Sequence, residues 1–131
     1  MKRRPAVVDW RYGLVTLVWM AGIYALSSRS DLGSDGKDQV VATASNLAHL
    51  PLFAGLAWCW FMTLAGMPHG SPQRLALAFL ASTAWAAADE WHQAFVPGRI
   101  ASAADFVVDV AAIAGMLLVL RLTAPEGIRE S

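Results

Sequence analysis

Four stretches of apolar residues, separated by shorter polar segments, divide the chain. They cover residues 12–26, 47–67, 75–88 and 106–122. A helix needs about 20 residues to cross the hydrocarbon core of a bilayer, so the second and fourth stretches are long enough as they stand. The first and third reach that length if polar residues at their ends lie at the membrane interface. The pattern predicts an all-α fold, an integral membrane bundle of about four transmembrane helices at residues 10–28, 46–67, 74–93 and 105–123.

The polar segments between these stretches are expected to be connections within one domain that covers residues 1–131. Segment 27–45 contains two glycines and charges of both signs, and is expected to be a loop. Segment 68–73 contains two prolines and a glycine, and segment 94–104 contains Pro97-Gly98-Arg99. Both compositions are typical of turns.

The first apolar stretch has two interpretations. It follows the basic residues 2–4 and ends in Ala25-Leu26-Ser27, a pattern that resembles a cleaved signal peptide. Its aromatic residues favour a retained helix instead, because tryptophan and tyrosine gather at membrane interfaces. They are Trp10, Tyr12, Trp19 and Tyr24.

Composition agrees with a membrane protein. Charged residues make up 15% of the chain, against roughly 25% in soluble proteins. The mean hydropathy is +0.45. Ten basic residues balance ten acidic ones, so net charge gives no indication of a nucleic-acid partner. Cys59 is the only cysteine and is expected to be a small buried apolar residue.

The distribution of basic residues predicts an orientation, because cytoplasmic loops carry an excess of lysine and arginine. With a cytoplasmic N-terminus, three basic residues lie outside: Arg29, Lys37 and Arg99. Seven lie inside: Lys2, Arg3, Arg4, Arg11, Arg74, Arg121 and Arg129. Both termini are therefore expected to be cytoplasmic.

This topology brings polar residues from several segments to the outer face. The candidate site residues are His49, Asp89, Glu90, His92, Gln93, Arg99, Ser102, Asp105 and Asp109. Side chains three or four positions apart share one face of a helix, which applies within residues 89–93 and to Asp105 with Asp109. Arg99 is the only cation of its loop, so we expect it to pair with these carboxylates. Ionisable groups near membrane depth usually face a bundle interior or a watery cavity.

Several chemistries fit this set of residues. The carboxylates with a histidine could hold a divalent cation, the histidines could act as bases, and Arg99 could grip a phosphate or carboxylate headgroup. Each residue also has a structural interpretation. Asp89 and Glu90 could be interfacial charges, and Asp105 could be a helix cap. His49 could be a hydrogen-bonded interface residue, and His92 could simply flank the bilayer.

Small residues on the third and fourth helices predict close packing. Ala84 and Ala88, and Ala111 and Gly115, are four residues apart. Such pairs let helix backbones approach each other in lipid. We therefore expect a larger residue at position 115 to destabilise the fold.

The segment from Asp89 to Asp105 resembles the VanZ-like family of small multi-helix membrane proteins. It can be written DE-x-x-Q-x-F-x-PGR-x-x-S-x-x-D. Ser27-Ser28 and Ala48-His49 are weaker similarities. The chain departs from the family pattern at Asn46, where a basic residue is expected, at Asp109, where asparagine is frequent, and at Ala112, where glycine is frequent. The departure at Asn46 weakens an anion-binding role for the second helix, and that at Asp109 adds a carboxylate.

The resemblance implies a role in the cell envelope, because the namesake of the family gives low-level resistance to the glycopeptide antibiotic teicoplanin. It does not imply a particular reaction. Three functions remain open. The protein could bind or modulate an outer-leaflet lipid or glycopeptide-like amphiphile. It could be a hydrolase or transferase acting on a phosphate-bearing envelope lipid, or a structural bundle without catalytic activity.

Overall fold

The structure, a computed structural model, describes residues 7–29, 39–97, 99 and 101–124, with side chains described from residue 48 onward in the second helix. It contains four helices, and the described residues include no strand. The all-α class is therefore confirmed. The helices are α1 (Trp10–Ser27), α2 (Gln39–Thr63), α3 (Pro72–Gln93) and α4 (Ala103–Leu122).

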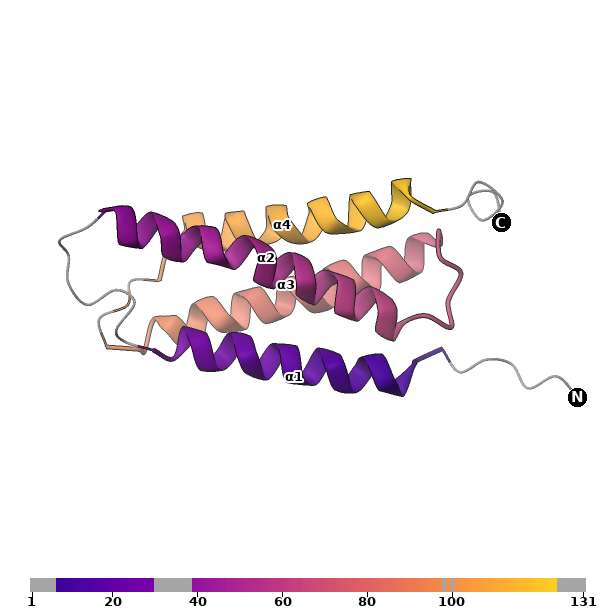
Figure 1. Ribbon diagram of the computed structural model, residues 1–131, viewed down its shortest axis with the longest axis horizontal. Helices are drawn as coiled ribbons and strands as arrows, with labels where there is room; N and C mark the ends of the chain where they lie inside the picture. Colours follow the sequence, from indigo (N-terminus) through magenta and orange to yellow (C-terminus); the bar gives the residue numbers. More distant parts are fainter. Residues whose placement is uncertain (1–6, 30–38, 98, 100, 125–131) are drawn as a thin grey trace, which may run out of the picture.

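The helices run alternately up and down along one common axis (Figure 1). Helix α2 is central and contacts the other three, whereas α1 and α4 share no interface within the described residues. Contact between α1 and α3 is the least extensive of the helix pairs that touch. One end of the bundle, here called the Asp89 end, holds the ends of α1 and α3 and the starts of α2 and α4. The other end is called the Arg74 end.

Helix α2 begins earlier than expected. The sequence predicted a loop over 27–45 and a helix from residue 46, but the helix already starts at Gln39. No glycine or proline lies between Gly36 and Pro51, so nothing in that stretch of sequence stops a helix. Pro51 lies inside α2, where its ring removes one backbone N–H from the helix.

At many positions polar side chains are buried and apolar side chains are exposed, the opposite of the usual arrangement in a soluble protein. The core contains Phe53, Leu56, Phe61 and Ile113, yet it also contains polar side chains. Those buried polar residues are Thr16, Ser27, Thr63, Ser71, Arg74, Ser82, Asp89, Gln93 and Asp109. Large apolar side chains instead lie exposed along α1, α3 and α4, and include Leu14, Val18, Leu80, Trp91, Val107 and Leu118.

Side-chain caps fix the starts of three helices. Asp9 accepts a hydrogen bond from the Arg11 N–H at 3.0 Å and begins α1. Ser71 accepts from the Arg74 N–H at 3.1 Å and precedes Pro72, which suits the first helical position. Ser102 caps α4 by accepting from Ala104 N–H at 3.2 Å. Asp105 is therefore not the cap of α4 and lies in its first turn instead.

All four carbonyl groups that a helix leaves unpaired at its C-terminus have partners in α2. Leu64 N–H donates to the Trp60 carbonyl and Ala65 N–H to that of Met62. Asp9 N–H donates to the Thr63 carbonyl at 2.8 Å and so ties α1 to this end. The Phe61 carbonyl accepts from Arg74, at 3.0 Å from Nε and 2.8 Å from Nη2.

The close helix approach occurs at a different glycine from the one expected. A Cβ atom at Gly55 would lie 2.5 Å from Cζ2 of Trp19, because the indole ring of α1 lies against the α2 backbone. Trp19 Nε1 donates to the Leu52 carbonyl at 2.8 Å and holds the ring there. At Gly115 a Cβ atom would meet nothing within 4 Å. The expected close approach at Gly115 is therefore wrong for this chain.

Helix α4 alone among the described helices is long and apolar enough to cross a membrane by length and composition. The other helices contain interfacial residue types or charges that lower their hydropathy. Helix α1 includes Arg11 and two tyrosines, and α3 includes Arg74, Asp89 and Glu90.

Candidate functional site

The nine candidate residues come from the Asp89 end of the bundle, but they form several separate contacts and not one cluster. Four of them belong to the last turns of α3, and Arg99 and Ser102 to the connection that follows. Asp105 and Asp109 belong to the first two turns of α4. His49 on α2 reaches Asp109 on α4.

Asp89 is the centre of the largest of these contacts. Its carboxylate is 4% exposed, and its Oδ2 accepts hydrogen bonds from Ser27 Oγ at 2.8 Å and from Gln93 Nε2 at 2.9 Å. Ser27 ends α1, while Asp89 and Gln93 lie one turn apart on α3. The contact therefore joins the ends of two helices through neutral donors.

Arg99 extends this contact to the connection before α4. Its Nη1 donates to Gln93 Oε1 at 3.3 Å, and its Nε and Nη2 each lie 3.5 Å from the carbonyls of Arg29 and Leu26, respectively. Among the described residues Arg99 forms no ion pair with a carboxylate, so the expected pairing with Asp89 or Asp105 is wrong. The guanidinium group instead caps the carbonyl-rich end of α1, where a helix favours a positive charge.

His49 and Asp109 form a buried pair between α2 and α4. His49 Nδ1 lies 3.3 Å from Asp109 Oδ1 and 3.5 Å from Oδ2. Asp109 is 1% exposed. Asp109 lies six residues beyond the start of α4, about 9 Å along the helix axis, so the pair lies inside the bundle and not at its rim.

Glu90 completes the cap of α4. Its carboxylate accepts a hydrogen bond from the Ser102 N–H, while the Ser102 side chain caps the Ala104 N–H. In a capping box, a glutamate three residues into the helix makes this contact. Here the glutamate comes from α3, so it fixes the start of α4 against the end of α3. The Asp105 carboxylate, half-buried, makes no hydrogen bond or ion pair with another described residue.

His92, near the end of α3, contacts two residues at the end of α1. Its Nε2 lies 3.0 Å from Ser28 Oγ, and its ring lies 4.5 Å from the ring of Tyr24, centroid to centroid. The Ser28 hydroxyl also donates to the Tyr24 carbonyl at 2.7 Å, which leaves the Ser28 oxygen as acceptor for the histidine.

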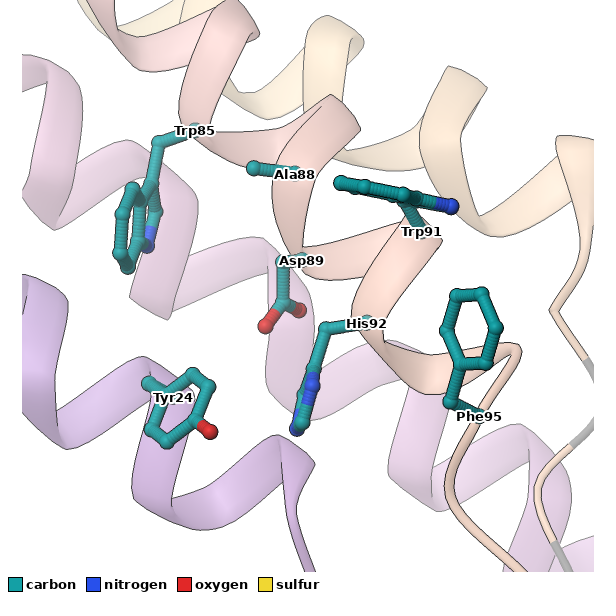
Figure 2. A pocket seen from close by; sticks show the side chains of 7 residues that line it. All are labelled: Tyr24, Trp85, Ala88, Asp89, Trp91, His92 and Phe95. Carbon is teal, nitrogen blue, oxygen red and sulfur yellow. The ribbon is translucent and has the colours of Figure 1, made fainter.

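An aromatic cleft of about 310 Å³ lies between α1 and α3 beside these contacts (Figure 2). Its lining residues are Tyr24, Trp85, Ala88, Asp89, Trp91, His92 and Phe95. Sequence reasoning identified Asp89 and His92 as site residues but missed the aromatic walls. Trp91 and Phe95, four residues apart and next to the Asp89 motif, were the available signal.

A smaller cavity, of about 80 Å³, lies between α1 and α2 near the same end of the bundle. Ser27, His49 and Arg99 line it together with apolar residues. The two cavities thus lie on either side of Ser27 and its hydrogen bond to Asp89.

No three His, Cys, Asp or Glu side chains among the described residues lie close enough together to hold a metal ion. The carboxylates are engaged separately: Asp89 with Ser27 and Gln93, Asp109 with His49, and Glu90 with the α4 cap. The described side chains thus do not assemble the divalent-cation site that the sequence suggested.

Comparison with known proteins adds no further assignment. No protein-family model, no curated protein and no solved structure matches the chain.

Proposed function

We propose that the protein is an integral membrane protein whose four helices all cross the bilayer and whose Asp89 end binds an outer-leaflet amphiphile. The distribution of side chains supports the membrane part. Exposed apolar residues occur along α1, α3 and α4, whereas Arg74, Asp89 and Asp109 are buried. Ionisable groups in membrane helices usually face the interior of the bundle, and apolar side chains face lipid. A soluble protein rarely exposes large apolar patches.

The aromatic cleft carries the binding part of the proposal. The cleft opens between α1 and α3, which have the smallest interface of the helix pairs in contact. Its volume falls near the lower end of the roughly 300–1,000 Å³ that is usual for small-molecule sites. Apolar rings line most of it, while Asp89 and His92 add polar groups. An amphiphile matches this division, because its chain meets the rings and its headgroup meets the polar residues.

The position of the cleft agrees with the resemblance to the VanZ-like family. Four cleft residues lie in the segment from Asp89 to Asp105, and two of them, Asp89 and Phe95, are at specified positions of the motif. The other two are Trp91 and His92. If the termini are cytoplasmic, the cleft faces the outer leaflet. A membrane protein that binds an amphiphile there would alter the access of such molecules to the cell surface, which suits a role in the cell envelope.

A structural role is the second candidate, and one observation favours it. Ser27, Asp89, Gln93 and Arg99 form a continuous chain of hydrogen bonds that ties the ends of α1 and α3. The enzyme alternative has less support, because Ser102, the hydroxyl that could serve as a nucleophile, is the cap of α4.

Filling the cleft tests the proposal. Ala88 is exposed and lines the cleft, so Ala88→Trp should block the cleft without disturbing the core. Ala114→Trp, at an exposed position on α4, is the matched control. Native mass spectrometry of the detergent-purified proteins should show bound lipid on the wild type and the control, and at least tenfold less on Ala88→Trp. Equal lipid occupancy in all three proteins, at equal melting temperature, would exclude the cleft as the binding site.

A further inference from the structure

The aromatic cleft contains an acceptor that the protein leaves unused. Asp89 Oδ2 receives two hydrogen bonds, but Oδ1 has no hydrogen-bond partner among the described residues although it is buried. A carboxylate oxygen without a donor is costly in a buried position. Figure 2 shows the carboxylate directed toward the rings of Tyr24 and His92, at the inner wall of the cleft.

The walls around this oxygen are rings that attract cations. Tyr24, Trp85, Trp91 and Phe95 line the cleft. The faces of such rings carry partial negative charge and bind ammonium groups within about 6 Å of their centres. Trp91 and Phe95 pack edge to face with their ring centroids 5.9 Å apart, so the two rings form one continuous side of the cleft.

The charge at this end of the bundle also favours a cation. The described residues there include four carboxylates, Asp89, Glu90, Asp105 and Asp109, against two guanidinium groups, Arg29 and Arg99. Arg99 does not offset the charge of Asp89 directly, because it contacts Gln93 and backbone carbonyls. An excess of negative charge raises the local concentration of positive ligands.

We propose that the cleft binds the headgroup of a membrane lipid that carries a primary ammonium group, with the ammonium between the aromatic rings and donating to Asp89 Oδ1. This inference deepens the proposed function and rests on it. A primary ammonium offers three N–H donors, whereas a quaternary ammonium offers none and would leave Oδ1 unpaired. Trp85 also lines the cleft, and its Nε1 is a buried donor without a hydrogen-bond partner among the described residues. This donor suits an oxygen of the same headgroup.

Binding requires a small opening, because Asp89 lines the cleft but its Oδ1 is buried. The half-buried His92 ring is the natural group to move, since one hydrogen bond to Ser28 and the stacking on Tyr24 hold it. No helix needs to shift.

The test compares three short-chain lipids that share two hexanoyl chains and a phosphate. Dihexanoyl phosphatidylethanolamine carries a primary ammonium, the phosphatidylcholine a quaternary one, and the phosphatidylglycerol no cation. Titration calorimetry on the purified protein in a nonionic detergent should give an affinity for the ethanolamine lipid about tenfold above that for the glycerol lipid. The choline lipid should fall between them.

Asp89→Asn should abolish this preference, so that the ethanolamine lipid and the glycerol lipid bind with equal affinity. Because Asp89 also holds Ser27 and Gln93, a second pair of variants avoids the network. Trp91 and Phe95 are each 72% exposed, so Trp91→Leu and Phe95→Leu should fold normally and weaken ethanolamine-lipid binding several-fold. Trp10→Leu, at the other end of the bundle and 67% exposed, is the control and should bind as the wild type does.

Two outcomes would overturn the inference, and they differ in what else they exclude. Equal affinity for all three lipids, lowered by Trp91→Leu but not by Trp10→Leu, would remove the ammonium preference and leave the cleft as an amphiphile site. No binding of any of the three lipids would remove both the inference and the proposed function.

Discussion

Arg74 and Asp89 lie near opposite ends of α3, and both are buried charges whose hydrogen-bond partners are neutral. Arg74 donates to the carbonyls of Phe61 and Met67 and stacks on the Phe61 ring at 3.8 Å. Asp89 accepts from a hydroxyl and an amide. Neither residue forms an ion pair with another described residue. Hydrogen bonds to charged groups are stronger than those between neutral groups, so each residue ties two helices together.

Replacement of Arg74 should therefore destabilise the fold. Arg74→Ala leaves the Phe61 and Met67 carbonyls without this donor, and each buried group without a partner costs about 1–3 kcal/mol. Arg74→Lys should recover only part of the loss, because an ammonium cannot reproduce the planar fork. Arg121→Ala, at an exposed position in the last turn of α4, is the control. The measurement is the free energy of unfolding in mixed micelles. Equal losses for Arg74→Ala and Arg121→Ala would contradict a stabilising role for the Arg74 hydrogen bonds.

At the residue scale, the sequence identified residues that form buried contacts more reliably than it identified their hydrogen-bond partners. The spacing of Asp89, His92 and Gln93 placed them on one side of α3, and the structure shows Asp89 bonded to Gln93. The partner of Arg99 could not be predicted in this way. Charge alone favoured a carboxylate, but Arg99 contacts the Gln93 side chain and two backbone carbonyls at the end of α1. A backbone carbonyl carries no signature in the sequence.

The existence of four helices was predictable, because four apolar runs of 14 to 21 residues are each too long for an ordinary strand, and the structure contains a helix at each of them. Their orientation about their own axes was not. A helix that is apolar on nearly all sides gives little indication of which side faces its neighbours. The small-residue rule therefore selected Ala111 and Gly115, which are exposed, whereas the close contact uses Gly55 against Trp19.

Two glycine-to-alanine substitutions should distinguish the packed helix surface at Gly55 from the exposed one at Gly115. Gly55→Ala forces the Trp19 ring away from α2 and strains its hydrogen bond to Leu52, which should cost about 1–3 kcal/mol. Gly115→Ala meets open space and removes a glycine from a helix interior, so it should be neutral or stabilise by about 0.5–1 kcal/mol. The melting temperatures of both variants can be measured in detergent. A larger decrease for Gly115→Ala than for Gly55→Ala would contradict the close helix contact at Gly55.

For the molecule as a whole, the orientation in the membrane remains a prediction. Arg74 belongs to the basic residues counted on the cytoplasmic side, but its side chain is buried and bonded within the bundle. Six basic residues then remain on that side against three on the other, so the asymmetry keeps its sign.

Cysteine labelling tests this orientation. In a Cys59→Ala background, Ala101→Cys lies at the Asp89 end and Gly70→Cys at the Arg74 end. Ala101 is exposed and avoids Ser102, whose side chain caps α4. In intact cells an impermeant maleimide should label Ala101→Cys and leave Gly70→Cys unlabelled until the membrane is opened. The reverse pattern would place the cleft at the cytoplasmic leaflet. Labelling at both positions in intact cells would exclude a bundle that spans the membrane.

If the bundle spans a membrane as proposed, the two buried charges of α3 have a consequence for how the chain enters that membrane during synthesis. Helix α3 is the least apolar of the four, and a charge inside a membrane is costly unless it reaches the interface or a partner. Its partners Ser27 and Phe61 belong to α1 and α2, which leave the ribosome first. In a bilayer, α3 is thus a stable segment only beside helices that are already in place. The translocon would release it as part of an assembling bundle and not as a separate helix.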